Sequence, residues 1–191
     1  KKLPVNFAKG WVKNFPDCPI AQHMYAALTH QKERDILAYT KKLYDDFSDS
    51  YNNKMQELNA VAIPEIIAIL PTKKYSSALD LGCGTGLFGQ AFSRHLRSLT
   101  GVDLSENMIE KARKTGCYQK LHTADILTFL EQNHQKYSLV TAIEVIGYFS
   151  NISDLFRLVG QHLTPAGLFA FSVETTSKNK PVLEPHGRYL Y

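Results

Sequence analysis

Cysteine and long apolar runs are both scarce in this sequence of 191 residues. The three cysteines, Cys18, Cys83 and Cys117, form no C-x-x-C pair, and their odd number leaves one thiol over in any disulfide scheme. This usage is typical of a reducing compartment, so we expect a cytoplasmic protein. No apolar run approaches the roughly 18 residues of a membrane-spanning helix, and no signal peptide is visible. We therefore expect no contact with a membrane.

A strong charge of one sign is also missing. The formal net charge is +4, and the lysines and arginines are scattered rather than gathered along one helix. The sequence therefore carries no signature of a nucleic-acid partner. No spacing of His, Cys, Asp or Glu is convincing as a set of metal ligands, so we expect no metal site. The length and an ordinary apolar fraction of 44% predict one main α/β domain with an extension.

The chain is organised around the stretch from Ala78 to Gly89, which reads Ala-Leu-Asp-Leu-Gly-Cys-Gly-Thr-Gly-Leu-Phe-Gly. A short apolar run ends in a glycine-rich turn, and apolar residues at helical spacing follow at once. A strand, a tight turn and a helix in this order open a nucleotide-binding βαβ unit. The glycines let the backbone approach a ligand closely, and N–H groups at the start of the helix face whatever lies above the strand.

The segment Asp80–Gly86 resembles the first motif of the class I S-adenosylmethionine-dependent methyltransferases. The same glycines, continued to Gly89, also match the G-x-G-x-x-G pattern of dinucleotide-binding folds, so a nicotinamide-dependent oxidoreductase is a rival hypothesis. Asp80 favours the methyltransferase, because a carboxylate just before the turn repels a pyrophosphate and attracts the ammonium and sulfonium groups of S-adenosylmethionine. The alternative is that Asp80 only accepts hydrogen bonds within the turn.

Four more strands alternate with helices after the turn. We expect them at residues 99–103, 118–122, 137–143 and 168–173. The pattern predicts a doubly wound, mostly parallel α/β sheet, and the resemblance implies the Rossmann-like order 3-2-1-4-5. In that order the crevice opens between the first and fourth strands, at their carboxyl ends, beside residues 144–149.

Two acids follow strands at places where a nucleoside would lie. Asp103 comes about 20 residues after the glycines, the distance at which an acid meets a ribose in such folds; the alternative is a solvated strand end. The resemblance implies that Asp125 accepts from the adenine amino group, although Asp125 also suits a helix N-cap that needs no ligand. Ile126 and Met108 are then available to sandwich the purine. The cofactor-binding residues that we expect are Tyr51, Asp80, Gly82, Cys83, Gly84, Gly86, Asp103, Leu104, Met108, Asp125, Ile126 and Glu144.

An aromatic stripe precedes the first strand. Tyr44, Phe47 and Tyr51 share one face at helical spacing, a pattern that more often packs in a core. Class I enzymes often have a similar helix that closes over the cofactor, which implies a contact through Tyr51. Its phenol offers both a ring face to a cation and a hydroxyl.

The candidate catalytic residue is Glu144, at the mouth of the fourth strand. Methyl transfer from a sulfonium needs alignment, a dry pocket and, for some acceptors, removal of a proton. Glu144 can serve as a general base, orient the acceptor or contact the methionine end of the cofactor through water. Solvation of a strand end is an equally good interpretation. Tyr148 and Phe149 form either an aromatic wall or part of the core.

Both ends of the chain lie outside the βαβ pattern. We expect a helical N-terminal extension over residues 1–40 and an S-adenosylmethionine-binding methyltransferase domain over 41–191. The extension reads as a helical hairpin and resembles a remnant of the tetratricopeptide repeats that some such enzymes carry; a helix covering the sheet is the alternative. Class I domains usually add a helix and an antiparallel strand pair after the fifth strand. The polar segment from Thr175 shows no such pair, so we expect a C-terminally incomplete domain with an exposed fifth strand.

These features predict an S-adenosylmethionine-dependent methyltransferase with a small-molecule acceptor. The Asn/Asp-Pro-Pro-Tyr/Phe signature of adenine and amide methyltransferases is absent after the fourth strand, and no Pro-Cys pair indicates cytosine C5 methylation. The alternative is a non-catalytic S-adenosylmethionine-binding regulatory or scaffold protein, whose crevice would be too narrow for an acceptor. The sequence indicates neither the acceptor atom nor the oligomeric state.

Overall fold

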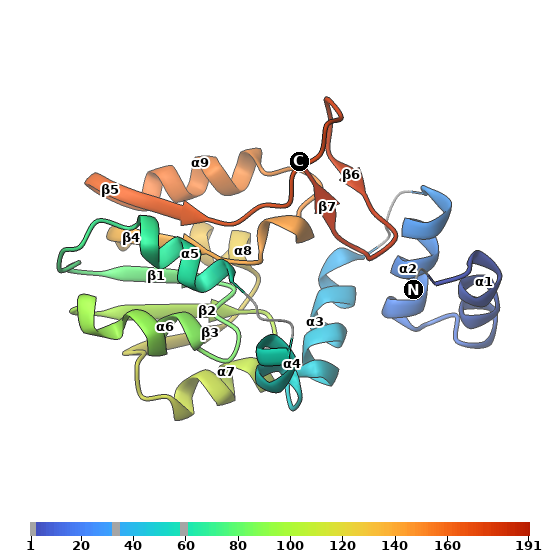
Figure 1. Cartoon of the computed structure of the whole chain (residues 1–191), viewed down its shortest axis with the longest axis horizontal. Helices are drawn as coiled ribbons and strands as arrows, with labels where there is room; N and C mark the ends of the chain where they lie inside the picture. The colour runs from blue at the N-terminus through green and yellow to red at the C-terminus, as the bar shows by residue number, and fades with distance from the viewer. Residues whose placement is uncertain (1–2, 32–34, 58–60) are drawn as a thin grey trace.

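A parallel sheet forms the centre of the molecule, in a computed structural model that describes residues 3–31, 35–57 and 61–191. Its five strands run in the order β3-β2-β1-β4-β5, which confirms the expected topology (Figure 1). The strands are Ala78–Leu81 (β1), Leu99–Asp103 (β2), Lys120–Thr123 (β3), Tyr137–Ala142 (β4) and Leu163–Phe171 (β5). β5 begins earlier than expected and includes the predicted turn at Pro165–Gly167, where its register with β4 shifts.

Helices cover both faces of this sheet (Figure 1). One face carries α5 (Ala62–Ile69), α6 (Leu87–Phe92) and α7 (Glu106–Lys114), and the other carries α8 (Ile126–Gln132) and α9 (Ser153–His162). Two short 3-10 turns, η1 (Ser93–His95) and η2 (Ile146–Tyr148), follow α6 and β4. Ser105 caps α7 as expected, accepting from the Met108 N–H over 3.2 Å. None of the helices in the described part of the chain has the length and apolarity of a membrane span.

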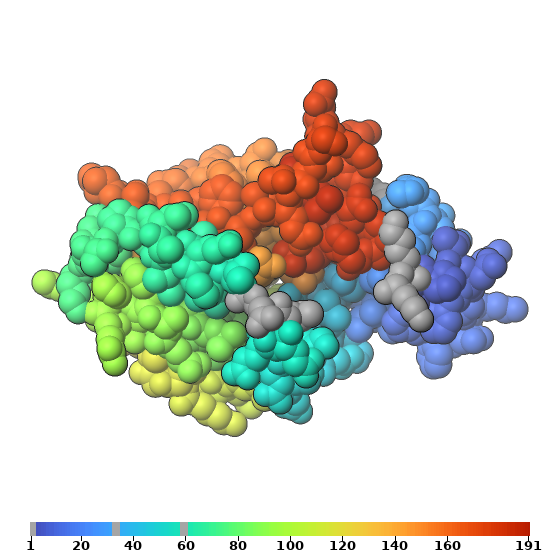
Figure 2. Space-filling view, viewed as in Figure 1, coloured from blue at the N-terminus to red at the C-terminus, as the bar shows by residue number. Residues whose placement is uncertain are grey.

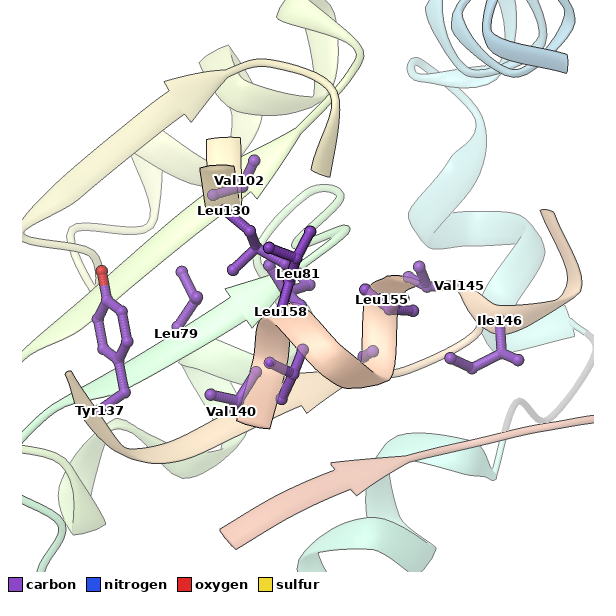
Figure 3. Packing of buried hydrophobic residues seen from close by; sticks show 12 residues of the cluster. Leu79, Leu81, Val102, Leu130, Tyr137, Val140, Val145, Ile146, Leu155 and Leu158 are labelled. Carbon is purple, nitrogen blue, oxygen red and sulfur yellow. The ribbon is translucent and has the colours of Figure 1, made fainter. Parts of the chain in front are cut away.

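The pleat of β1 sends its side chains alternately to the two faces of the sheet. Leu79 and Leu81 are fully buried in the cluster formed with α8 and α9, as Figure 3 shows. Ala78 packs with α5 and α6 on the opposite face. Because side chains two residues apart share a face, Asp80 points to the side of Ala78. Asp80 is therefore an interior strand residue and not part of the turn.

Tyr118 fills the space between β1, β2 and α6, where two glycines make room for its ring. A Cβ at Gly89 would lie 2.6 Å from the ring, and one at Gly101 would lie 2.8 Å from it. The Tyr118 hydroxyl donates to Asp80 Oδ2 over 2.7 Å, and the Thr141 hydroxyl donates to Asp80 Oδ1 over 2.8 Å. Tyr118 thus precedes the third strand, which we expected to contain it, and holds a buried carboxylate instead.

The N-terminal residues form helices beside the sheet domain (Figure 1). α1 (Val5–Asn14) and α2 (Pro19–Thr29) form the expected helical hairpin, and α3 (Ile36–Phe47) and α4 (Tyr51–Glu57) follow. The predicted boundary at residue 40 falls inside α3, and residues 1–2 and 32–34 of the predicted extension lie outside the described residues. The aromatic stripe is therefore not on one helix, because α3 ends at Phe47 and α4 begins at Tyr51.

The segment after β5 folds back onto the molecule. β6 (Val182–Leu183) and β7 (Tyr189–Leu190) pair antiparallel, so the expectation of a missing strand pair is wrong. This pair forms a small sheet of its own, and β5 stays at the edge of the main sheet. The Gly187 carbonyl accepts a hydrogen bond from His23 Nε2 over 2.8 Å. Figure 2 shows the segment, in red, lying between the sheet domain and the N-terminal helices.

We predict that Tyr118→Phe destabilises the protein in a pH-dependent way. Burial raises the pKa of Asp80 to about 6, and the Tyr118 hydroxyl opposes that rise. The pKa of folded Asp80 therefore lies above its unfolded value, so ionised Asp80 destabilises the fold above that pKa and the protonated acid does not. Losing the hydroxyl should cost about 1–3 kcal/mol of unfolding free energy at about pH 8 and less at about pH 5.

Urea unfolding at the two pH values measures this difference. Tyr137→Phe is the matched control, because the Tyr137 hydroxyl accepts from the neutral Asn133 amide. Its cost should be the same at both pH values. Equal costs for Tyr118→Phe at the two pH values would contradict the prediction.

Candidate functional site

Two cavities adjoin at the carboxyl ends of the central strands. The first, of about 460 Å³, lies between the glycine turn and α4, and the second, of about 340 Å³, lies between the end of β2, α3 and residues 144–151. Five residues line both cavities: Tyr51, Gly82, Gly84, Ile143 and Glu144. The crevice expected between β1 and β4 is therefore the place where the two cavities meet.

The glycine turn is hydrogen-bonded to β2. The N–H groups of Gly82 and Cys83 donate to the Val102 carbonyl over 2.8 and 3.0 Å, and the Gly84 N–H donates to Asp103 Oδ2 over 2.8 Å. Gly82, Gly84 and Gly86 have φ values of +68°, +52° and +88°, which side chains rarely tolerate. The Gly84 N–H is thus already bound to a carboxylate of the protein. In phosphate-binding turns the corresponding N–H binds an anionic ligand.

Asp80 lies one layer below this turn. It is 2% exposed, and its two oxygens accept from Tyr118 and Thr141. Asp80 still lines the first cavity, so its negative charge acts on a ligand in that cavity from the side of the sheet. The sequence analysis expected Asp80 just before the turn to face the ligand; in the structure Asp103 is the carboxylate that contacts the turn itself. The physical reason is the strand pleat, which turns Asp80 into the layer between the sheet and α6.

Asp103 is the last residue of β2. It lies between α7 and the two glycines, Gly82 and Gly84, that line both cavities. Its Oδ1 accepts from the Ser105 N–H over 2.9 Å, and burial raises its pKa against the opposing effect of the N–H groups of Ser105, Gly84 and Leu104. Each carboxylate oxygen has a second lone pair, so the contacts with Gly84 and Ser105 leave acceptor capacity for a ligand. Leu104 lines the second cavity beside it.

Asp125 and Ile126 line the second cavity opposite the glycine turn. Asp125 also caps α8, because its Oδ2 accepts from the N–H and the hydroxyl of Thr128 over 2.9 and 3.0 Å. The cap that the sequence offered as an alternative is therefore present, and both contacts end on the same oxygen. The second oxygen of Asp125 takes no part in this cap.

The structure corrects the placement of Met108 and leaves Cys83 at the cavity wall. Met108 is completely buried on the inward face of α7 and lines neither cavity, so it is not available to sandwich a purine. Cys83 lines the first cavity, but its side chain packs against Gly101 and is 6% exposed. Burial raises the pKa of its thiol well above the ordinary value. Cys83 therefore lies at the wall of the first cavity with its thiol packed toward Gly101.

Three tyrosines from separate segments form a cluster beside the meeting point. Tyr51 lines both cavities, and Tyr44 and Tyr148 line the second. The Tyr44 and Tyr148 hydroxyls are 2.8 Å apart, and the Tyr44 ring stands at 62° to Tyr51 and 76° to Tyr148. Burial raises the pKa of Tyr51 to about 12 and raises those of Tyr44 and Tyr148. The three phenols are therefore neutral at physiological pH.

Glu144 lines both cavities and has an unusual backbone. Its φ of +60° is in the left-handed region, which costs a residue with a Cβ about 1–2 kcal/mol. Ser172 supports it twice, accepting from the Glu144 N–H over 2.7 Å and donating to Oε1 over 3.0 Å. Arg188 Nη1 donates to Oε2 over 2.9 Å, and the Arg188 guanidinium lies 5.6 Å from the Tyr148 ring centre. Glu144 is therefore held in place from the side away from the cavities.

Sequence reasoning missed several of these residues. Arg188 and Ser172 are 44 and 28 residues from Glu144, and no local pattern connects them. Thr85 was within reach of the sequence, because it lies inside the glycine motif. Its hydroxyl donates to Asn52 Oδ1 over 2.6 Å, which ties the turn to α4.

Among the described residues, the charged side chains that line the two cavities are all acidic, and Arg188 pairs with one of them without lining either cavity. Four carboxylates line them, those of Asp80, Asp103, Asp125 and Glu144, and no Lys, Arg or His of the described residues does. No cluster of three or more metal-ligating side chains occurs within residues 3–31, 35–57 and 61–191. An anionic wall of this kind attracts a cationic ligand and repels a phosphate.

Comparisons with known proteins agree with this geometry. A family described as "Methyltransferase domain" matches residues 51–188. A ubiquinone biosynthesis O-methyltransferase of Coxiella burnetii is 28% identical over 104 residues, which cover 53% of this chain and 44% of that protein. A dTDP-3-amino-3,4,6-trideoxy-alpha-D-glucopyranose N,N-dimethyltransferase of Streptomyces venezuelae is 33% identical over 101 residues, covering 51% and 42%. The chain thus spans less than half the length of either relative.

A solved structure has a similar fold. The DhpI-SAH complex matches with a TM-score of 0.59 and 15% identity over 81% of this chain and 79% of that one. At this level of identity the match shows the fold.

We predict that an alanine in the glycine turn destabilises the protein more at Gly82 than at Gly84. A Cβ at Gly82 would lie 2.3 Å from Val145 Cγ2, whereas nothing lies within 4 Å of one at Gly84. Gly84→Ala should cost about 1–2 kcal/mol of unfolding free energy for its positive φ, and Gly82→Ala about 1–3 kcal/mol more for the clash.

Thermal and urea unfolding of the two variants measure the difference. Adding Val145→Ala should recover part of the loss in Gly82→Ala and none in Gly84→Ala. The prediction is wrong if the two single variants are equally stable or if Val145→Ala affects both alike.

Proposed function

The chain belongs to the methyltransferase-domain family, and we propose that it transfers a methyl group from S-adenosylmethionine to a small-molecule acceptor. One observation carries the proposal: carboxylates line both cavities, and within the described residues no basic side chain does. S-adenosylmethionine carries an ammonium and a sulfonium, so this wall suits it. The contact between Asp103 and the Gly84 N–H opposes a pyrophosphate, and with it the dinucleotide alternative.

The proposed orientation of the methyl donor follows the positions of the carboxylates. The nucleoside lies in the second cavity, where Asp103 accepts from the ribose hydroxyls and Asp125 from the adenine amino group. Leu104 and Ile126 contact the purine there. The methionine end lies over the glycine turn in the first cavity, above Asp80. The methyl group is then close to the residues that line both cavities.

When bound, S-adenosylmethionine supplies an electrophilic methyl group on a good neutral leaving group. The chain itself has three tasks. It aligns donor and acceptor, with the turn and Asp103 fixing the donor; it excludes water with Tyr51 and Ile143; and it balances positive charge with its carboxylates. The thioether product lacks the sulfonium charge, so the same carboxylates hold it less strongly and favour its release.

Room for an acceptor favours an enzyme over a purely regulatory protein. The second cavity extends past the proposed nucleoside contacts to α3 and to residues 148–151, where an acceptor can approach. The two relatives act, by name, on small molecules, which supports the same class of acceptor here. The cysteine usage supports a cytoplasmic location. We keep residues 1–40 as an extension and 41–191 as the methyltransferase domain, with α3 shared between them.

We predict that Asp103→Asn weakens binding of S-adenosylhomocysteine by about 10- to 100-fold, the loss expected for a charge-assisted hydrogen bond. The asparagine amide would also face one of the two N–H donors that the carboxylate now accepts from. Isothermal titration calorimetry measures the affinity. Glu131→Gln, an exposed acid on α8 that lines neither cavity, controls for net charge. Unchanged affinity in Asp103→Asn, or protection of the chain by a nicotinamide dinucleotide in a thermal-shift assay, would contradict the proposal.

We also predict that S-adenosylmethionine binds more weakly as the pH falls through about 6. Asp80 has its pKa raised to about 6 by burial, so it is ionised above that pH and neutral below it. Protonation removes a negative charge beneath a cationic ligand and should lower the affinity about ten-fold. Asp80→Asn should bind at the low-pH level throughout and lose that step. A step of the same size in Asp80→Asn would assign it to another group.

A further inference from the structure

The meeting point of the cavities has the chemistry of a site for a positively charged or hydrogen-bond-donating group. Glu144 supplies a carboxylate there, and Tyr44, Tyr51 and Tyr148 supply rings from α3, α4 and η2. The Tyr44 ring packs edge to face with the Tyr51 and Tyr148 rings, at centroid distances of 6.2 and 5.8 Å, so the rings border this place without stacking. Ring faces attract cations, and the Arg188 guanidinium already lies over Tyr148 at 5.6 Å.

The same place lacks a group suited to deprotonating a hydroxyl. The three phenols are neutral because burial raises the pKa of each. No histidine of the described residues lines either cavity. Both oxygens of Glu144 are already engaged, since Oε1 accepts from Ser172 and Oε2 accepts from Arg188. An alcohol has to lose its proton as the new bond forms, whereas an amine attacks through a lone pair that it already has.

We propose that the methyl acceptor is an amine, and that Glu144 receives its nitrogen within the ring cluster of Tyr44, Tyr51 and Tyr148. This inference rests on the proposed function, because it names the acceptor class of that same site. The acidic lining of the two cavities disfavours acceptors with a phosphate near the reacting nitrogen. The names of the two relatives do not indicate which atom accepts the methyl group here, since one is an O-methyltransferase and the other an N,N-dimethyltransferase.

The transfer step balances without a further reactant. The lone pair of the neutral amine forms the new N–C bond to the methyl carbon, and the C–S bond breaks with its electron pair going to sulfur. The product ammonium leaves the site and then gives one proton to bulk water. An amine that is protonated in solution loses its proton to water before it enters the site. Glu144 holds an N–H of the amine through a free lone pair of its carboxylate.

The test uses sinefungin, the S-adenosylmethionine analogue in which a carbon bearing an amino group replaces the methylated sulfonium. Its amine projects to the position of the transferred methyl group and thus reports whether Glu144 receives a nitrogen there. Calorimetry on the full chain should find sinefungin bound about 10- to 100-fold more tightly than S-adenosylhomocysteine, the range of a charge-assisted hydrogen bond. Glu144→Gln should reduce this ratio to about three-fold or less. Glu131→Gln, the distant control, should leave the ratio intact.

The outcomes separate this inference from the proposed function. If S-adenosylhomocysteine binds but sinefungin binds no better, or if the preference persists in Glu144→Gln, the amine assignment is overturned and the methyl-donor site stands. If neither S-adenosylmethionine nor S-adenosylhomocysteine binds the unaltered chain, the proposed function itself fails. If Glu144→Gln does not fold, Ser172→Ala, which removes one of the hydrogen bonds to Glu144, should lower the ratio, and an unchanged ratio there also counts against the inference.

Discussion

The hydrogen bond from the Gly84 N–H to Asp103 Oδ2 is the contact on which the rest of the site depends. It joins the turn after β1 to the end of β2 and fixes a carboxylate where the two cavities adjoin. The turn's geometry is that of an anion-binding loop, yet its N–H is already occupied by an acid. A fold shared with phosphate-binding proteins thereby presents the opposite charge to its ligand.

A second layer supports this contact from below. Tyr118 and Thr141 hold Asp80 beneath the turn, and Gly89 and Gly101 make room for the Tyr118 ring. Two buried acids lie close together there, and each raises the energy of the other's ionised form. Such an arrangement is unfavourable in an empty protein. A cationic ligand relieves it, so part of the binding energy comes from strain already present in the fold.

The sequence predicted what local patterns determine and missed what distant segments determine. Ser105 and Asp125 could be read as helix caps because a cap and its helix are adjacent in the chain. The sequence analysis did not consider the direction of the Asp80 side chain, although the two-residue period of the strand points it inward. Met108 was expected to contact the purine, but the helical period of α7 turns its side chain to the core. Arg188 could not be found at all, because its partner Glu144 is far away in sequence and the short β6–β7 pair has almost no pattern of its own.

The two sides of the site are built by different parts of the chain. Strand ends and the glycine turn, all from the middle of the sequence, surround the proposed donor. The proposed acceptor side is built by α3, α4 and η2, with Glu144 held by a residue of the C-terminal segment. That segment also contacts α2 through Gly187 and His23. In the proposed arrangement, substitutions near either terminus would change which molecule is modified while the source of the methyl group stays the same.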